Sequence, residues 1–248
     1  MRSFSLSSGL IIFSINIVAF FVPLLIISEV LFGDAPLAQA AACTESKVQA
    51  SDKQANDYYG NAVDIDGDIA LVGAHREDTG GGGAGAAYIL NRWTQGNNTG
   101  WIQSQKIQAG DKQAGDQFGH SVAIDGDLMV IGAYKEDSGG GGAGAAYIFN
   151  KLGAAWSQQA KIQASDKSGG DEFGVSVDID GDTVVVGAYK EDPGGTSNAG
   201  AAYVFTKHGA AWSQQAKIQA SDKSGGDEFG VSVDIDGDTV VVLSLIHI

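Results

Sequence analysis

One string recurs almost unchanged along this chain, and it constrains the fold more than any other feature. Its best copy, residues 171–192, reads DEFGVSVDIDGDTVVVGAYKED. Related copies occupy residues 57–78 and 116–137, and a fourth begins at Asp227. The lysines of a K-[IV]-Q-A tag, at positions 47, 106, 161 and 217, set a period of 55 to 59 residues. A period of this size is typical of propellers and solenoids.

Within one unit, four short runs have the character of antiparallel strands. In the third unit these runs are residues 174–180, 182–189, 200–206 and 211–219. The first alternates apolar and polar residues, and Asp180-Gly181 predicts a two-residue hairpin turn after it. The second contains three valines in succession, 184–186, which suits a strand covered on both faces. The fourth is rich in polar residues, which suits an outer edge.

Recurring aromatic residues predict packing between neighbouring units. A tyrosine follows a Gly-Ala-Ala in each unit, and a tryptophan precedes each later K-I-Q-A lysine by five residues. One large aromatic side chain at a fixed place per unit is most simply explained by inter-unit packing. These residues are Tyr88, Tyr147, Tyr203, Trp101, Trp156 and Trp212. The pattern predicts an all-β fold, a β-propeller of four-stranded antiparallel blades rather than a solenoid.

The repeat resembles the FG-GAP repeat, which is found in integrin α chains and in many secreted bacterial proteins. The resemblance rests on a Phe-Gly in the first strand, an Asp-Gly turn and a Gly-Ala that closes the second strand, recurring in register over residues 47–242. Tyr59-Gly60 is the one aromatic substitution in the Phe-Gly pair. The resemblance implies a partial propeller of three complete blades and half of a fourth, and extracellular protein or carbohydrate ligands.

The chain divides into an N-terminal segment, the repeats and a short tail. We expect a signal segment at 1–42, a linker at 43–46, repeats at 47–105, 106–160 and 161–216, a partial repeat at 217–242 and a non-native tail at 243–248. The tail reads LSLIHI and is not repeat sequence. It resembles the translation of a sequencing adapter, so we expect the true protein to be longer.

The N-terminal segment has the features of an export signal. An apolar run from Leu10 to Phe32 is followed by the small residues Ala38-Gln39-Ala40, which suit a signal peptidase. We favour a cleaved signal over a retained membrane anchor, because Pro23 and Glu29 interrupt the run. Lipidation at Cys43 is a third interpretation. The protein is therefore expected to be secreted or held at the cell surface.

Charge and cysteine content narrow the partners and the chemistry. The chain has 30 acidic and 15 basic residues, and its net charge of -15 repels phosphate backbones, so we expect no nucleic-acid partner. Membrane contact is expected only through an uncleaved N-terminal segment or a lipid on Cys43. That cysteine is the only one, so no intrachain disulfide forms. No Ser or Cys recurs with a His partner, and we therefore expect no enzyme activity.

The string DIDGD invites a calcium interpretation. Asp178, Asp180 and Asp182 offer three oxygen ligands with a glycine, as calcium loops do. The resemblance adds that several integrin blades bind Ca²⁺ between their first two strands. In this chain the loop is shortened to a tight turn, and Ala123 replaces the first Asp in the second repeat. We favour a hairpin turn and keep Ca²⁺ at these three residues as the alternative.

A second acidic group follows from topology. In an antiparallel blade, the link into the first strand and the link between the second and third strands lie at the same end. Surface loops of this kind carry recognition, so we predict a binding or cation-collecting face there, with a solvated acidic surface as the alternative. The candidates are Asp111, Asp116, Glu136, Asp137, Asp166, Asp171, Glu191 and Asp192.

The sequence predicts an exported, non-catalytic module for extracellular binding or cell adhesion. Asn97-Asn98-Thr99 is a candidate glycosylation sequon in the insertion that lengthens the first repeat. Two other functions stay open: a structural surface or matrix repeat without a specific ligand, and an accessory propeller of a larger secreted enzyme.

Overall fold

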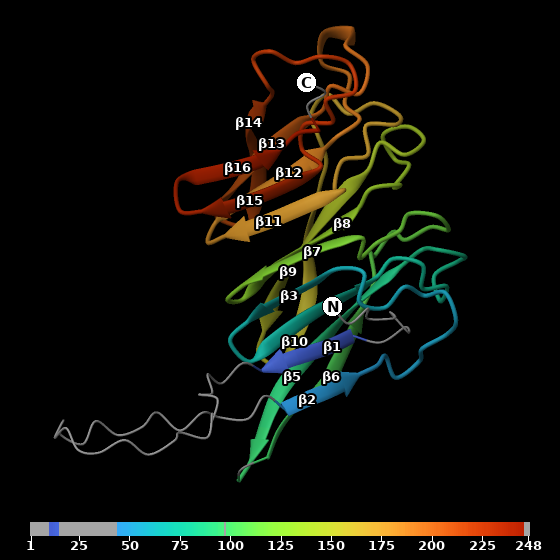
Figure 1. Ribbon diagram of the computed structural model, residues 1–248, viewed down its shortest axis with the longest axis vertical. Helices are drawn as coiled ribbons and strands as arrows, with labels where there is room; N and C mark the ends of the chain where they lie inside the picture. Colours follow the sequence, from blue (N-terminus) through green and yellow to red (C-terminus); the bar gives the residue numbers. More distant parts are fainter. Residues whose placement is uncertain (1–9, 15–43, 97, 246–248) are drawn as a thin grey trace, which may run out of the picture.

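The computed structural model describes residues 10–14, 44–96 and 98–245, and it is all-β as predicted. Three four-stranded antiparallel sheets and the C-terminal one of two two-stranded sheets follow one another along the long axis (Figure 1). Each strand pairs with the next one in sequence, so the first and fourth strands form the edges of each sheet. We call each four-stranded sheet a blade and this C-terminal two-stranded sheet the half blade.

The bounds of the strands repeat from blade to blade. The first blade contains β3 (Val63–Asp66), β4 (Ile69–Ala74), β5 (Ala86–Gln95) and β6 (Asn98–Ile107). The second contains β7 (Ser121–Asp125), β8 (Leu128–Ala133), β9 (Ala145–Leu152) and β10 (Ala155–Ile162). The third contains β11 (Ser176–Asp180), β12 (Thr183–Ala188), η1 (Pro193–Gly195), β13 (Ala201–His208) and β14 (Ala211–Ile218). The half blade contains β15 (Ser232–Asp236) and β16 (Thr239–Leu243), and β1 (Leu10–Ser14) pairs antiparallel with β2 (Thr44–Val48).

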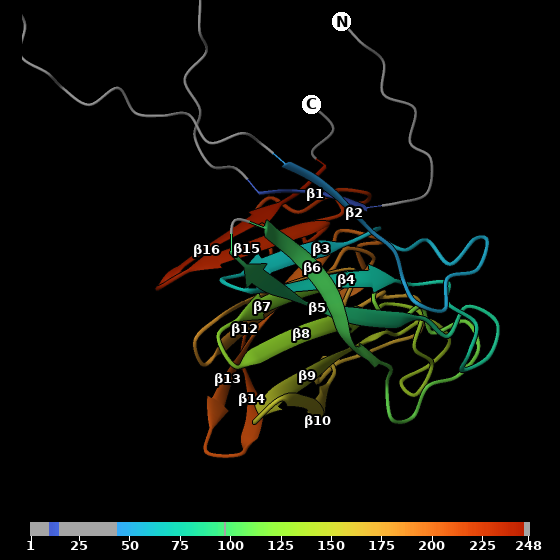
Figure 2. The same ribbon diagram turned by 90° about the horizontal axis from the view of Figure 1, so that it is seen from below.

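The blades are arranged as wedges of a partial propeller. Their first strands contact one another directly, β3 with β7, β7 with β11 and β11 with β15. Their fourth strands, β6, β10 and β14, have far fewer contacts with each other. The view from below shows β10 and β14 on the side of the stacked sheets away from β3 and β15 (Figure 2). The first strands are therefore the inner strands, which confirms the predicted propeller architecture.

The core lies between blades rather than inside any one of them. Val184, Val185 and Val186 in β12 are fully buried, because one face packs on the second blade and the other on the half blade. Trp156 of β10 is buried in the cluster that joins the first two blades, as the recurring aromatics predicted. The K-I-Q-A lysines lie at the ends of the fourth strands, so the predicted repeat boundaries at residues 106, 161 and 217 fall within these strands.

Glycines of the Phe-Gly and Gly-Ala pairs meet across each blade interface. A Cβ on Gly132 of β8 would lie 2.0 Å from the carbonyl oxygen of Gly174 in the third blade. Gly174 itself has a φ of +91°, and a Cβ there would lie 2.4 Å from the carbonyl oxygen of Ala145. No side chain fits between these backbones. The two dipeptides that mark the repeat in sequence are therefore the contact between blades.

The hairpin turn after the first strand lies one residue later than predicted. Asp180 pairs with Thr183, which leaves Gly181 and Asp182 as the two turn residues in place of Asp180-Gly181. Gly181 has a φ of +54°, so glycine at the first turn position supplies the positive φ that the hairpin needs. Asp180 stays in the ladder, and its carboxylate has a partner in the half blade, described below.

Several sequence predictions lie outside the described residues. These are the signal peptidase region Ala38–Ala40, the lipidation candidate Cys43, the glycosylation candidate Asn97 and the end of the tail, residues 246–248. In the part of the chain that the structure describes, no helix is long and apolar enough to cross a membrane.

We expect Gly132→Ala to lower the free energy of unfolding by about 3 kcal/mol, because its Cβ would force the backbones of two blades apart. The measurement is urea denaturation followed by circular dichroism. Gly141→Ala is the matched control: nothing lies within 4 Å of its Cβ position, so stability should stay unchanged or rise by up to about 1 kcal/mol. Equal effects of the two substitutions would contradict the role of the glycine contact.

Candidate functional site

The two kinds of connecting loop lie together at one end of each blade, as predicted. In the second blade, the amide of Lys135 donates to the carbonyl of Asp116 at 3.3 Å, which joins the two loops. The amide of Glu172 in the third blade donates to the carbonyl of Gly142 at 3.1 Å, which joins neighbouring blades. We call this end the loop face. It comprises residues 49–62, 75–85, 108–120, 134–144, 163–175 and 189–200.

A lysine of the fourth strand holds the two loops of its blade together. In the second blade, the Lys161 ammonium lies 2.7 Å from the Asp111 carboxylate and 2.8 Å from that of Glu136. The Tyr147 hydroxyl donates to the other oxygen of Asp111 at 2.9 Å. Gln163 donates to the second oxygen of Glu136 at 2.9 Å. The side chain of Glu136 is only 2% exposed, so this charge depends on its partners.

The same arrangement, which we call the lysine cluster, recurs in each blade. In the first blade it consists of Lys106, Asp52, Glu77, Tyr88 and Gln108. In the third it consists of Lys217, Asp166, Glu191, Tyr203 and Gln219. In every case the ammonium also lies 5.5 to 5.6 Å from the centroid of the tyrosine ring. A cation–π contact thus adds to the ion pairs.

The charges of the lysine cluster stabilise one another. Burial alone would raise the pKa of Asp111, but the Lys161 ammonium and the Tyr147 hydroxyl hold it below its ordinary value. Burial alone would lower the pKa of Lys161, but its hydrogen bonds to Asp111 and Glu136 raise it. Burial and the nearby Asp111 carboxylate raise the pKa of Tyr147. Lys161 and Asp111 are therefore both ionised at neutral pH.

The other predicted binding residues also have partners inside the loops. The carboxylates of Asp116 and Asp171 are buried and accept hydrogen bonds from the amides of Gln113, 2.7 Å, and Ser168, 2.6 Å. Burial, with neighbouring carboxylates, raises the pKa of Asp116 and of Asp171. The exposed Asp137 and Asp192 accept from backbone amides of their own loops at 2.6 and 2.7 Å. The structure thus brings all eight candidates to one face, each with a partner that shapes the loops.

A row of cations and aromatic rings runs along the same face, beside the ends of the first and second strands. Sequence reasoning missed it, although an aromatic-basic pair follows Gly-Ala in every complete blade. Arg76 lies 4.8 Å from the Tyr58 ring centroid. The corresponding distances are 5.0 Å for Lys135 over Tyr134 and 5.1 Å for Lys190 over Tyr189. We call these six residues the cation–aromatic row.

Two histidines and one glutamate connect the members of this row. The rings of His75 and His120 lie 5.4 Å apart, and His120 lies 4.3 Å from the ring of Tyr134. Burial, with the nearby His120 and Arg76, lowers the pKa of His75 to about 4. Burial also lowers the pKa of His120. Both rings are therefore neutral at neutral pH.

Glu172 joins the second and third blades within the row. Its carboxylate accepts from both Lys135 and Lys190, and the second of these ion pairs has a distance of 3.0 Å. Glu172 has a φ of +57°, a conformation that costs energy for a residue with a side chain. The backbone at this position thus places a buried carboxylate where two ammonium groups from different blades meet it.

The calcium candidates lie at the opposite end of the blades. Asp178 and Asp180 each accept a hydrogen bond from an amide of the half blade, that of Ile235 at 2.6 Å and that of Gly237 at 2.5 Å. Asp182 instead lies 3.7 Å from the ammonium of Lys207. In the described part of the chain, no group of three or more His, Cys, Asp or Glu side chains is placed to hold one metal ion.

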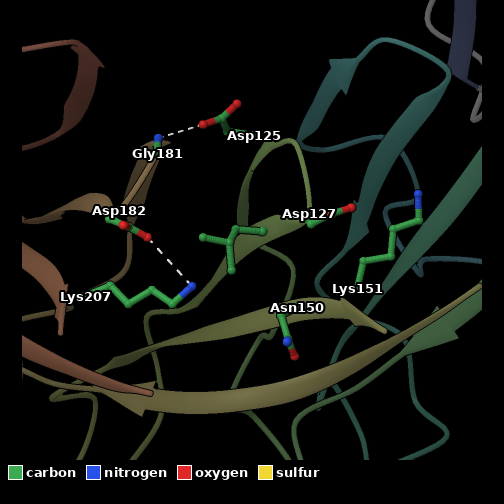
Figure 3. Close-up of a pocket in the computed structure, with 8 residues that line it drawn as sticks. Asp125, Asp127, Asn150, Lys151, Gly181, Asp182 and Lys207 are labelled. Atoms are coloured by element: carbon green, nitrogen blue, oxygen red, sulfur yellow. Dashed lines mark hydrogen bonds and ion pairs between the residues drawn. The ribbon is translucent and has the colours of Figure 1, made fainter. Parts of the chain in front are cut away.

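The turn end also contains a shallow pocket between the second and third blades, of about 350 Å³. Figure 3 shows Asp125 bonded to the amide of Gly181 and Asp182 paired with Lys207 at its wall. The remaining polar lining comes from Asp127, Asn150 and Lys151. Asp125, which joins the second and third blades, thus has a structural role at the wall of this pocket.

A family model of the FG-GAP repeat matches residues 44–90, 101–149, 156–205 and 212–243. These four segments together span well over half of the chain. A search of curated proteins found no match to the chain.

We expect Lys161→Met to lower the free energy of unfolding by about 3 kcal/mol, because it leaves the buried Glu136 carboxylate without its cation. Chemical denaturation at neutral pH measures this change. Lys112→Met removes an equal charge from an exposed position on the same face, and its effect should stay within about 0.5 kcal/mol. If both substitutions cost the same, the cluster does not hold the loops.

The lysine cluster also predicts a pH dependence of stability. Asp111 has a folded pKa below its ordinary value of 3.8, so its contribution is present above 3.8 and is lost as the pH falls through the folded pKa. Lys161 has a folded pKa above 10.5, so its contribution is present below 10.5 and is lost as the pH rises through the folded pKa. Urea denaturation across both ranges measures this dependence.

Asp116 and Asp171 have raised pKa values, so their protonation stabilises the folded state as the pH falls, whereas protonation of Asp111 destabilises it. A variant is therefore needed to isolate the contribution of the lysine cluster. In Lys161→Met, the loss of stability below pH 3.8 should become smaller than in the wild type. An unchanged acid dependence in this variant would show that Asp111 does not depend on Lys161.

Proposed function

Because the chain belongs to the FG-GAP repeat family, we propose that it is an exported, non-catalytic β-propeller module that binds extracellular protein or carbohydrate through its loop face. The export part of this proposal rests on the N-terminal sequence. The binding part rests on the loop face, where a repeated framework carries side chains that differ between blades.

The framework and the differing positions can be separated residue by residue. The lysine cluster repeats in every complete blade and ties each pair of loops to the fourth strand. Positions between these anchors differ from blade to blade. The residue before Phe-Gly is Gln117 in the second blade and Glu172 in the third. The residue after Gly-Ala is His75 in the first blade and Tyr134 in the second. Rigid elements that present variable loop residues are a common arrangement for recognition. This observation carries the proposal.

The loop face supports binding better than the turn end does. At the turn end, each complete blade contributes carboxylates that accept amides of the next one, such as Asp66 to Gly126 at 2.8 Å and Asp125 to Gly181 at 2.6 Å. These groups are used to join blades. On the loop face, Arg76 is exposed and makes no ion pair among the described residues. A partner can therefore engage it without breaking the framework.

We expect the purified chain to bind members of an array of extracellular polysaccharides and glycoproteins, and to lose binding when the loop face is covered. In a Cys43→Ser background, a polyethylene glycol chain would be attached to Gly141→Cys on the loop face or, as the matched control, to Asp127→Cys at the turn end. Modification at 141 should weaken binding at least about tenfold, and modification at 127 should have little effect.

Equal losses from the two modifications would overturn the assignment to the loop face. No binding to any array member would favour the structural matrix repeat. Hydrolysis of an array member by the chain would favour a role in an enzyme.

A further inference from the structure

Building on the proposed function, we propose that the cation–aromatic row is a binding track for an acidic polysaccharide, with one charged sugar engaged at each complete blade. The row comprises Tyr58 with Arg76, Tyr134 with Lys135, and Tyr189 with Lys190.

The same pairing of a cation with an aromatic ring recurs in each complete blade. In each blade a basic residue follows the second strand and lies over an aromatic ring at 4.8 to 5.1 Å. A sugar acid has two matching features, a carboxylate and a ring whose C–H face is apolar. An aromatic side chain offers an apolar face to such a ring, and the neighbouring cation attracts its carboxylate. One such pair per blade suits a polymer that repeats the same unit.

The row contains more cations than anions. Arg76 makes no ion pair among the described residues, and Lys135 and Lys190 share the single carboxylate of Glu172. Three cations and one anion leave the row positive, in a chain whose net charge is -15. The side chains of Lys135 and Lys190 keep 37% and 36% of their surface exposed. Anions therefore meet accessible positive charge along this line.

The row continues from one blade to the next. The ring centroid of Tyr58 lies 5.1 Å from that of His75, and the ring centroid of His75 lies 5.4 Å from that of His120. His120 in turn lies 4.3 Å from Tyr134. These rings form an uninterrupted aromatic path from the first blade to the second. Glu172 continues the path as a charged link to the third blade.

The surroundings of the row favour a sparsely charged polymer over a nucleic acid. Exposed carboxylates at Asp78, Asp137 and Asp192 lie two residues after each basic residue of the row. A phosphate backbone, with its closely spaced charges, would be repelled by these groups. A polysaccharide with one carboxylate per sugar can place its acid at the cation and its hydroxyls toward the carboxylates.

The test measures binding of the full chain to immobilised polygalacturonate, with uncharged dextran as the reference and a salt series for both. We expect binding to polygalacturonate that weakens as salt rises, and no binding to dextran. Arg76→Gln should weaken binding about fivefold to tenfold. Lys112→Gln, which removes one exposed positive charge from the same face, should change it less than twofold.

A second variant examines the other two blades without leaving a buried charge unpaired. The combined change Lys135→Gln, Lys190→Gln and Glu172→Gln removes both ammonium groups together with their shared carboxylate. It should weaken polygalacturonate binding at least as much as Arg76→Gln does. Its thermal unfolding, measured in parallel, separates lost binding from lost folding.

Three results would overturn the track. These are no binding to polygalacturonate, equal loss in Arg76→Gln and Lys112→Gln, and binding to double-stranded DNA at least as tight as to polygalacturonate at the same salt. If array binding persists and still depends on the loop face, the proposed function stands and the track is wrong. If array binding is also absent, both are wrong.

Discussion

Contact between glycine backbones of neighbouring blades is the constraint on which the rest of this structure depends. Gly132 faces the carbonyl of Gly174, and the corresponding pairs, Gly73 with Gly119 and Gly187 with Gly230, repeat the contact at the other interfaces. Because glycine has no Cβ, the inner strands can approach closely, and the blades pack as wedges. The apolar clusters can then close between the sheets.

The lysine cluster also recurs once in each complete blade. A blade edge brings the end of the fourth strand near both loops, and Lys161 places one positive charge among carboxylates that would otherwise repel each other. The loops keep their shape because each acidic group has a donor. A strongly acidic chain thereby supports long glycine-rich loops without an intrachain disulfide, and the cation–aromatic row remains available to a ligand.

The two ends of a blade have different chemistry for a physical reason. At the turn end, hairpins are short, and several of their carboxylates accept hydrogen bonds from amides of the next blade, as Asp178 does from Ile235. At the loop face, longer connections leave room for side chains that do not join blades. Ligand binding is therefore expected at the long connections of the loop face, and contacts between blades at the short hairpins of the turn end.

The sequence alone determined the period, the four strands of each blade, the buried second strand and the common end of the acidic loops. These follow from local rules, since alternation, glycine turns and repetition are visible without coordinates. Only the tertiary structure decided what the acids do. Asp111 and Glu136 looked like free ligands, but the lysine that pairs with them is 25 to 50 residues distant in sequence. The structure also joined Arg76, Lys135 and Lys190 into one row, because the histidine rings and the Glu172 carboxylate that link them come from separate blades and meet only after the blades pack.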